Sequence, residues 1–519
     1  MERAQPQAGR PAESSQQSLP KNSPAEMRQA NDVSAPSKPF DRRRRLRTDP
    51  LKPKKQDPKE RLSNFNEVSK AIELHDAILE ASRCLQCEHH PCTMGCPAHN
   101  DIPGALWLLE QGDVPGALRK FRETSNFPDI CGRLCPQEKQ CEGACVVGTC
   151  SLPVAIGKLE AFCTDHVRQH MGGWEPPSME PPLGTRVAVI GSGPAGLAVA
   201  EELARRGHGV VIFEAWPRPG GLLVYGIPGF KLNKEAVWAH IDYVKAMGVE
   251  IRCNTHIGEG LTVDDLLRKE GFDAVFLGHG ASSGNRMKIP GEELKNVYNA
   301  TEYLVRGNLP DELLPESMHG RPHAGQRTVV VGGGDTAMDC VRTARRLRPD
   351  GEVWCVYRRS EVEMPGRYEE RVNAYEEGVK FEFLTLPVKF IGDEEGKVVA
   401  CECIRMKLGK PDAKGRRSPV PIEGSNFVLD CDTAVTAIGY SVDDEISRTT
   451  ENLKTTKWGS IWVNTEEEGQ TSREEVWAAG DCVRGADLIV TAMAPARKAA
   501  RSIDTALRAR LKRQGKLAQ

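Results

Sequence analysis

Two glycine-rich segments of the chain have the residue types and spacing that bind dinucleotides. The first contains Gly191, Gly193 and Gly196, directly after the apolar run 187–190. In such a turn the first glycine permits a sharp reversal, the second lets the backbone approach a pyrophosphate, and the third lets a helix pack on the strand. The next apolar run ends in Glu214, where a carboxylate can accept hydrogen bonds from an adenosine ribose. This arrangement predicts one dinucleotide site.

The second segment repeats the arrangement between another apolar run and another predicted helix. Its turn residues are Gly332, Gly334, Asp335, Thr336 and Ala337. Here the following apolar run ends in Arg358 and Arg359, which suit a 2′-phosphate and therefore favour NADPH. The stretch 360–365 leaves NADH possible, and a solvated strand end is the alternative interpretation of both Glu214 and the arginine pair.

Two further pieces fit a flavin site. Gly220 and Gly221 can bring the backbone close to a flavin or its phosphates, and Gly480 precedes Asp481 at the end of a predicted strand. The carboxylate of Asp481 suits the ribityl chain of a flavin, and Gly480 permits close approach. Neither piece would carry the assignment alone.

Cysteines are concentrated in one part of the chain. Of the 17 cysteines, ten lie between Cys84 and Cys163, and eight of these form two short-spaced groups: Cys84, Cys87, Cys92 and Cys96, then Cys131, Cys135, Cys141 and Cys145. Each [4Fe–4S] cluster needs four ligands, and a four-cysteine run closed by Cys-Pro is typical of ferredoxins whose fourth cysteine crosses to the other cluster. We therefore expect two clusters that share the two groups. Zinc and structural thiols are the alternatives, and two Cys-Pro closures fit zinc poorly.

Length and charge limit the class of protein. The 519 residues suit three or four domains, and 70 Lys and Arg against 72 Asp and Glu give no overall case for binding nucleic acid or a membrane. No apolar run is long enough to span a membrane, and the N-terminus has no secretory apolar region. We expect a cytoplasmic protein in a reducing compartment, where clustered cysteines indicate metal ligation rather than disulfides.

The elements that must position these residues alternate between strand and helix from residue 186 onward. This alternation predicts an α/β fold with two Rossmann-like, three-layer domains, one inserted in the other, preceded by an α-helical domain with two clusters. The expected boundaries are 1–60 for a disordered basic tail, 61–180 for the iron–sulfur domain, 181–320 and 446–519 for the FAD-binding domain, and 321–445 for the NADPH-binding domain. The tail has 14 basic and 8 acidic residues, including the run 42–47. We interpret that run as solvated rather than as an address or a patch for an anionic partner.

Taken together, these motifs resemble the small (β) subunit of NADPH-dependent glutamate synthase. The wider family includes the N-terminal half of dihydropyrimidine dehydrogenase, and the resemblance covers about residues 61–510. The residues that carry it are Arg61, Phe65 and Glu67, the segment 83–87, both cysteine groups, and the segments 153–157, 191–196, 221–228, 332–339, 357–359 and 480–481.

The resemblance implies FAD at the first turn, NADPH at the second and two [4Fe–4S] clusters. By the crossed pattern of the family, one cluster would take Cys84, Cys87, Cys92 and Cys145. The other would take Cys96, Cys135 and Cys141, with a fourth ligand at Glu160, where the pyrimidine dehydrogenase branch has a glutamine. Cys131 is the alternative fourth ligand.

The implied activity is an NADPH-dependent oxidoreductase that feeds electrons to a glutamate synthase large (α) subunit, which makes L-glutamate from 2-oxoglutarate and glutamine. Hydride transfer needs no acid–base pair, so no catalytic residue is assigned. A reductase that serves ferredoxin, a pyrimidine or a sulfur compound is the second hypothesis. A redox-sensing or scaffold subunit is the third.

Overall fold

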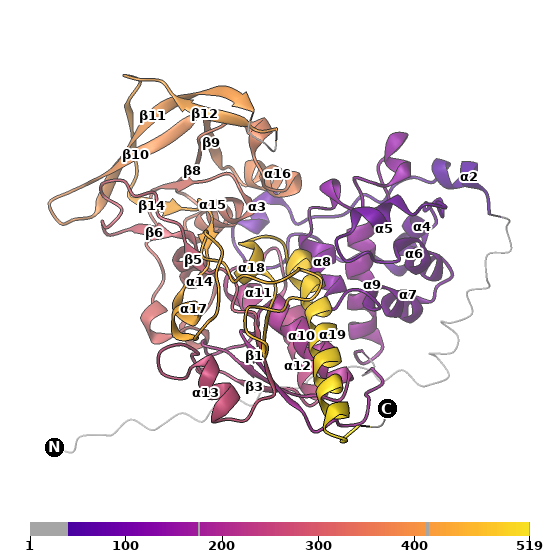
Figure 1. Cartoon of the computed structure of the whole chain (residues 1–519). Helices are drawn as coiled ribbons and strands as arrows, with labels where there is room; N and C mark the ends of the chain where they lie inside the picture. The colour runs from indigo at the N-terminus through magenta and orange to yellow at the C-terminus, as the bar shows by residue number, and fades with distance from the viewer. Residues whose placement is uncertain (1–39, 175–176, 412–414, 518–519) are drawn as a thin grey trace, which may run out of the picture. The chain divides into compact units, whose positions relative to one another are not determined.

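The computed structural model describes residues 40–174, 177–411 and 415–517 (Figure 1). Every element below belongs to one compact unit, Asp41–Gln519. None of the helices in the described residues is both long and apolar enough to cross a membrane.

The cysteine-rich part is helical. Its helices are α4 (Leu74–Ala81), α5 (Pro91–Gly95), α6 (Ile102–Glu110), α7 (Val114–Arg122), α8 (Pro128–Leu134) and α9 (Ile156–His170). Helices α6 and α7 begin with the same signal, because Asp101 and Asp113 each accept a hydrogen bond from the backbone N–H three residues on, with a proline in the first turn. Helices α6 and α7 therefore separate the two cysteine groups, and α4, α6, α7 and α8 all contact α9.

The first nucleotide-binding domain contains a five-stranded parallel sheet of order β16-β4-β1-β2-β3. The strands are β1 (Arg186–Ile190), β2 (Gly209–Phe213), β3 (Glu250–Arg252), β4 (Ala274–Leu277) and β16 (Val476–Ala478). Apolar residues of α10 (Pro194–Arg205), α12 (Lys234–Ala246) and α19 (Ile489–Arg513) pack on one face. A second apolar cluster, which includes α13 (Val263–Arg268), covers the other face. Strand β16 pairs with β4, although a long stretch of sequence lies between them. The domain is therefore split by an insertion.

The inserted part contains a second parallel sheet of order β6-β14-β7-β8-β9. Its strands are β6 (Val297–Asn299), β7 (Arg327–Val331), β8 (Glu352–Tyr357), β9 (Lys380–Phe383) and β14 (Thr433–Thr436). Helices α14 (Ala300–Asn308), α15 (Asp335–Leu347) and α16 (Tyr368–Glu376) belong to the same domain, and residues of all three pack in one apolar cluster with β7 and β8. The expected fold class, with one Rossmann-like domain inserted in the other, is confirmed by this strand order.

An antiparallel sheet covers the other face of the inserted domain. It consists of β10 (Thr385–Gly392), β11 (Val398–Pro411), β12 (Arg417–Pro421) and β13 (Phe427–Asp430). Phe390, Cys401, Cys403 and Cys431 are buried there against valines of the parallel sheet. These three cysteines are therefore small core residues.

The expected disordered tail differs from the structure in its second half. Residues 1–39 lie outside the described part, but Arg42–Arg47 form helix α2 and Pro58–Arg61 form α3. Asp41 caps α2 by accepting hydrogen bonds from two backbone N–H groups, and Arg45 is buried. The interpretation of the arginine run as solvated was wrong for Arg45, because composition alone did not predict the partners that bury this side chain.

Candidate functional site

The first glycine turn follows β1 and opens α10. Gly191 has a φ of +91°, and a Cβ there would lie 2.7 Å from the Gly278 carbonyl oxygen. A Cβ on Gly196 would lie 1.9 Å from the Gly191 oxygen, so the helix can pack this closely only on glycine. Gly193, in contrast, faces open space. The turn therefore has the exposed N–H groups and the room that a pyrophosphate requires.

Glu214 lies at the end of β2 beside this turn. Its carboxylate accepts a hydrogen bond of 3.1 Å from the Ser192 backbone N–H, another from the Ser192 hydroxyl, and one of 2.9 Å from the Trp216 N–H. The ribose-binding residue expected from the sequence is thus held against the phosphate-binding turn. That is the relative position that a bound adenosine diphosphate needs.

The other two flavin-site segments also meet this turn. Gly221 has a φ of +52°, and a Cβ there would lie 2.9 Å from the Gly193 Cα. Gly480 has a φ of +79°, and a Cβ would lie 2.9 Å from the Cβ of Ala195. Gly220 has a φ of +123°. Asp481 follows at the start of α18 (Asp481–Arg484), and burial raises the pKa of its carboxyl to about 6.

The second turn joins β7 to α15. Gly332 has a Cβ position 2.3 Å from the Ala437 oxygen, whereas Gly334 faces open space, as Gly193 does in the first turn. Asp335, Thr336 and Ala337 form the first turn of α15. The arginine pair at the end of β8 divides: the Arg358 side chain is exposed, while Arg359 is buried and its Nε donates to the Arg417 carbonyl at 2.8 Å.

One cavity of about 1200 Å³ joins the two turns. Its lining includes Gly191, Gly193 and Glu214 from the first site and Gly334 and Arg358 from the second. Dinucleotides held at the two turns would therefore extend into a common space. The cavity wall also includes residues that the sequence motifs did not indicate, among them Leu134, Lys231 and His279.

His279 is an unpaired polar group in that wall. It follows β4, where the strand reaches the first turn, and its two ring nitrogens have no hydrogen-bond partner among the described residues. Burial lowers its pKa to about 4, so the ring is neutral at physiological pH. Two buried ring nitrogens with unused donor and acceptor positions fit a wall that a polar ligand completes. The sequence signal for His279 was its position directly after a buried strand, and no motif marks that position.

The first set of cysteines surrounds a small gap. Cys84, Cys87, Cys92 and Cys145 line it together with Leu85, Pro91, Pro103, Val146 and Val147. The backbone between the cysteines turns tightly, because Gln86 (φ +47°) and His90 (φ +42°) both adopt the left-handed conformation. The described residues contain no group of three His, Cys, Asp or Glu that would hold a single metal ion. A gap lined by four thiols fits a cage-like cluster, in which each corner takes one cysteine.

The second set brings Cys96, Cys135, Cys141 and Glu160 together. Burial raises the pKa of Cys141 well above its usual value, and the nearby Glu142, Glu160, Cys96 and Cys135 raise it further. Burial, followed by Cys135, also raises the pKa of Glu160. The Asn100 side-chain amide donates to Glu160 Oε1 at 3.1 Å. Because cluster ligands must be deprotonated, binding at this set would release protons.

Cys131 lies beside the second set, one helical turn before Cys135 on α8. The Cys135 N–H donates to the Cys131 carbonyl at 2.9 Å, and the neighbouring Cys135 thiol, followed by burial, raises the pKa of Cys131. Both candidates for the fourth ligand are thus buried at the same place.

The two sets differ in their distance from the nucleotide cavity. Cys131 and Cys135 are packed in the same apolar core as α10, α12 and α19, and Leu134 between them lines the cavity. Cys84 belongs to a separate core made by the helices of the cysteine-rich part, which also contains Cys141 of the second set. The second set therefore approaches the nucleotide cavity through Cys135, next to Leu134, whereas no member of the first set is in the core around α10, α12 and α19 or lines the cavity.

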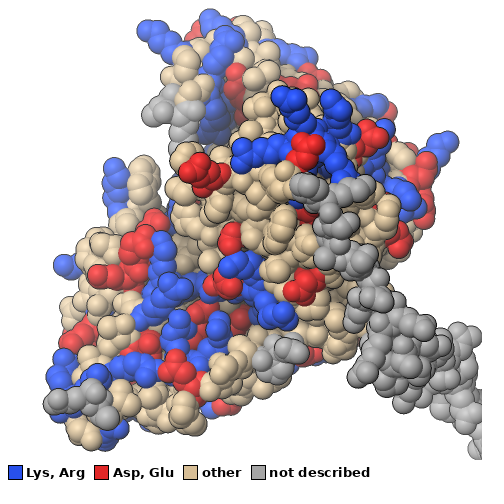
Figure 2. All heavy atoms as spheres, turned by 90° about the vertical axis from the view of Figure 1, so that its right-hand side faces the viewer, with Lys and Arg blue, Asp and Glu red and all other residues tan. Residues whose placement is uncertain are grey.

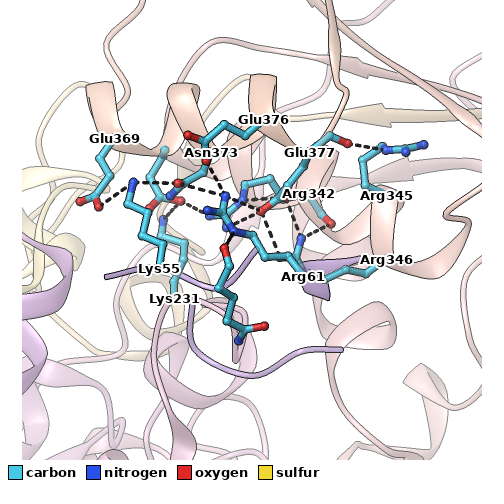
Figure 3. Close-up of polar contacts among 12 residues, drawn as sticks. Lys55, Arg61, Lys231, Arg342, Arg345, Arg346, Glu369, Asn373, Glu376 and Glu377 are labelled. Atoms are coloured by element: carbon cyan, nitrogen blue, oxygen red, sulfur yellow. Dashed lines mark hydrogen bonds and ion pairs between the residues drawn. The ribbon is translucent and has the colours of Figure 1, made fainter. Parts of the chain in front are cut away.

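A buried ionic network fixes the inserted domain to the rest (Figure 3). Glu377 is paired with Arg342 at 2.9 Å and with Arg346 at 2.8 Å, all three side chains having 1% exposure or less. Arg61, from the segment before the cysteines, reaches Glu376 at 2.7 Å. Lys231, from the first nucleotide domain, pairs with Asp339 of α15 at 2.9 Å. The arrangement of the two turns about their cavity is therefore held by paired charges from three segments.

Two family profiles match the chain. The profile of dihydropyrimidine dehydrogenase domain II, 4Fe-4S cluster, matches residues 61–172. The profile of pyridine nucleotide-disulphide oxidoreductase matches residues 185–496, which is more than half of the chain. The boundary between the two matches falls between α9 and β1.

Several curated proteins are similar over most of the chain. The putative oxidoreductase AegA of Escherichia coli is 41% identical over 85% of this chain and 67% of its own length. The glutamate synthase [NADPH] small chain of Escherichia coli is 38% identical over 87% of this chain and 96% of its own. The NADP(+)-dependent formate dehydrogenase subunit beta of Moorella thermoacetica is 38% identical over 80% of this chain and 60% of its own.

Among solved structures, FprA of Mycobacterium tuberculosis in complex with NADPH has a similar fold. The TM-score is 0.53 at 20% sequence identity, over 66% of this chain and 87% of that one. At this identity the likeness concerns the fold of the nucleotide-binding part alone.

Proposed function

Because the chain belongs to the pyridine nucleotide-disulphide oxidoreductase family, as an NADPH-dependent FAD and iron–sulfur oxidoreductase related to glutamate synthase small chains, we propose that it is the electron-input subunit of a larger enzyme. It would take electrons from NADPH and deliver them, through FAD and two [4Fe–4S] clusters, to a large subunit that makes L-glutamate from 2-oxoglutarate and glutamine.

The observation that carries this proposal is the shared cavity with Leu134 in its wall. Both nucleotide turns open into that cavity, and Leu134 directly precedes Cys135 of the second cysteine set. When bound, the dinucleotides supply hydride chemistry and the clusters supply one-electron chemistry. The chain thus offers one route from the NADPH turn to the second cysteine set, and then to the first set near the surface.

The residues of the chain have separate tasks in this scheme. The N–H groups at Gly193 and Gly334 would bind the two pyrophosphates, and Glu214 would hold the ribose of FAD. Arg358 would bind the 2′-phosphate, because its side chain is exposed in the cavity, whereas Arg359 is engaged with the Arg417 carbonyl. Gly220, Gly221, Gly480 and Asp481 would complete the flavin end. The first cysteine set would hold one [4Fe–4S] cluster, and the second set would hold the other.

A second candidate is an electron-input subunit for another acceptor. The relatives at about the same identity include a formate dehydrogenase subunit and an NADPH-Fe(3+) oxidoreductase subunit of Geobacter sulfurreducens, which is 37% identical over 80% of this chain. The nucleotide and cluster sites would be the same, and the electron-accepting partner would differ.

Anaerobic purification followed by addition of NADPH tests the core of the proposal. We expect the flavin absorbance to bleach and a cluster signal to develop in electron paramagnetic resonance, more readily with NADPH than with NADH. A flavin that NADPH leaves oxidised would rule out the electron-input role and favour a sensing or scaffold subunit.

Co-expression with a glutaminase-containing large subunit then separates the two candidates. NADPH-dependent formation of glutamate from 2-oxoglutarate and glutamine supports the first. A chain that bleaches with NADPH but yields no glutamate with that subunit serves another acceptor.

A further inference from the structure

The arginine run at 42–47 is built into the surface beside the first cysteine set. Arg45 is the buried member of helix α2, and its Nη1 donates to the Cys84 carbonyl at 2.8 Å and to the Ser82 carbonyl at 2.9 Å. Its Nη2 donates to both carboxylate oxygens of Glu110 at 2.8 Å. A planar guanidinium that binds a carboxylate and two carbonyls at once fixes the orientation of the helix that carries it.

The remaining arginines of α2 point away from this anchor. Arg42, Arg43, Arg44 and Arg47 are exposed, and no ion pair is found for their side chains within the described residues. Two carboxylates beside the helix are already engaged, Asp41 as the helix cap and Glu110 with Arg45. Asp49, two residues after Arg47, is exposed, and no ion pair is found for it within the described residues. Lys52 and Lys54 continue the exposed positive charge along the following segment. We call these six residues the basic patch.

Figure 2 faces the helices of the cysteine-rich part and shows Lys and Arg side chains gathered at the level of α2, with few acidic side chains among them. Unpaired positive charges on one face create a local potential that attracts an oppositely charged protein and orients its approach. The overall charge of the chain is close to neutral, so this concentration of charge is local.

The neighbouring surface exposes the cysteine loops themselves. Cys87, Cys92 and Cys145 are only partly buried, and the exposed side chains near them in sequence include three apolar ones, Met94 (69% exposed), Val146 (39%) and Leu152 (61%), as well as Glu88, His89 and His90. The hydrogen bond from Arg45 Nη1 to the Cys84 carbonyl, at 2.8 Å, places helix α2 directly beside these loops. Apolar contacts next to an electron-carrying centre, bordered by charge, are typical of transient redox interfaces.

We propose that the basic patch is the docking surface for the electron-accepting protein, and that this partner presents an acidic face to it. The inference rests on the proposed function, because it takes the first cysteine set to be the exit for electrons. For each NADPH oxidised to NADP⁺ and a proton, two electrons leave, one to each of two one-electron acceptors. The patch would increase the rate at which such acceptors reach the surface over Cys87 and Cys145.

Two haem proteins of opposite charge serve as probes, acidic cytochrome b5 and basic cytochrome c. The full-length holoenzyme is assayed with NADPH and each cytochrome between about 0.05 M and about 0.3 M salt, a range over which exposed charges are increasingly screened. The test variant is Arg43→Glu, Arg44→Glu and Arg47→Glu together. It leaves Arg45 and Arg42 in place. Positions 43 and 44 lie in the first turn of α2, where acidic residues are tolerated, and Arg47 is the exposed last residue of the helix.

The control variant is Lys512→Glu, Arg513→Glu and Lys516→Glu, which makes the same charge change at exposed positions at the C-terminal end of α19 and just after it. We expect wild type and control to favour cytochrome b5, with a kcat/KM that falls as salt rises. The test variant should lose at least about 10-fold in kcat/KM for cytochrome b5, lose its salt dependence and gain with cytochrome c. Flavin bleaching by NADPH and iron content should be unchanged.

The outcomes separate the two proposals. If NADPH does not bleach the wild-type flavin, the proposed function fails before docking is tested. If it does bleach, and the test variant reduces cytochrome b5 as wild type does, the docking proposal is overturned while the function stands. Loss of iron from the test variant, together with an equal loss of kcat/KM for both cytochromes, would indicate a structural defect and would also overturn the docking proposal. Binding to anionic phospholipid vesicles that needs these arginines, with unchanged cytochrome b5 reduction, would assign the patch to a membrane surface.

Discussion

Lys231 and Asp339 form a 2.9 Å ion pair that joins the first nucleotide-binding domain to the inserted one inside their common cavity. Both side chains are less than 10% exposed, and Glu370 lies 3.9 Å from the same Lys231 Nζ. Glu370 in turn is paired with Arg342, so the contact continues into the buried network of α15 and α16. The relative position of the two turns therefore depends on this pair.

Replacing Lys231 by methionine should destabilise the protein strongly. The change keeps the aliphatic length but leaves Asp339 buried and uncompensated, which costs about 3–5 kcal/mol in comparable pairs. We expect a fall in Tm of several degrees and slower flavin reduction by NADPH. Thermal denaturation followed by circular dichroism and stopped-flow absorbance measure the two effects.

The double variant Lys231→Met with Asp339→Asn should recover part of the Tm, because it removes the stranded charge. Lys245→Met is the matched control, since Lys245 pairs with Asp242 at 4.0 Å on the surface, with both side chains at least half exposed. Exposed pairs contribute about 0–1 kcal/mol. Equal Tm values for the Lys231 and Lys245 variants would show that the buried pair does not hold the domains together.

Lys234 gives the stability a specific pH dependence. Its Nζ donates to the Leu223 carbonyl at 2.7 Å and to the Ile227 carbonyl, and burial lowers its pKa to about 7 from 10.5. Between these two values the unfolded chain binds more protons than the folded chain, so the contribution of Lys234 to the free energy of unfolding rises with pH. Below about pH 7 the penalty for charging the buried amine is fully present.

The variant Lys234→Met lacks this titration. The Tm of wild type relative to the variant should therefore increase from about pH 7 towards pH 10, by an amount that corresponds to at most ~5 kcal/mol. Scanning calorimetry of both proteins across this range measures it. A difference in Tm that stays constant with pH would mean that the amine remains charged in the folded protein.

The sequence predicted the parts of the fold that short-range patterns encode. Glycine spacing and the ends of apolar runs located both turns, and the comparisons confirm the fold class and the FAD, NADPH and [4Fe–4S] cofactors, though the number of clusters stays a proposal. His279 and Lys231 escaped notice, because each is brought to the cavity by strand order and domain packing. Arg45 was missed for a related reason. Its partner Glu110 is distant in sequence, and its partner at Cys84 is a backbone carbonyl, which no side-chain pattern marks.

Arg358 should determine the preference for NADPH over NADH. Its exposed side chain lines the cavity at the end of β8, where a 2′-phosphate can accept charge-assisted hydrogen bonds. In Arg358→Ala the KM for NADPH should rise at least about 10-fold, as expected for loss of a hydrogen bond to a charged group, while the KM for NADH changes little. Steady-state reduction of ferricyanide with each coenzyme measures both values.

Arg348→Ala is the control for that substitution. Arg348 is a partly buried arginine of the same domain that pairs with Asp350 at 3.0 Å and does not line the cavity. Its replacement should leave both coenzymes unaffected. If Arg358→Ala raises the KM for NADPH and the KM for NADH equally, the side chain contacts a part of the coenzyme that both share. The preference would then have to come from another residue of the cavity.

The fourth ligand of the second cluster can be decided by iron content. We predict that Glu160→Leu lowers the iron from about eight to about four per chain, because one of two [4Fe–4S] clusters loses a corner, whereas Cys131→Ala keeps about eight. Cys163→Ala is the control: it is a buried cysteine on the same helix as Glu160 and belongs to neither set. Iron analysis and electron paramagnetic resonance of the anaerobic proteins give the two readouts.

The reason for favouring Glu160 lies in its surroundings. Its carboxyl is buried beside Cys135, and only one interaction with it, the hydrogen bond from Asn100, favours the charged form over burial. An iron ion would compensate the charge that burial otherwise disfavours, so the ligand role explains a buried acid that the apolar core does not need. Glu160→Cys should then retain both clusters and shift the midpoint potential of one, because a thiolate replaces a carboxylate. Full iron in Glu160→Leu with loss in Cys131→Ala would assign the position to Cys131 instead.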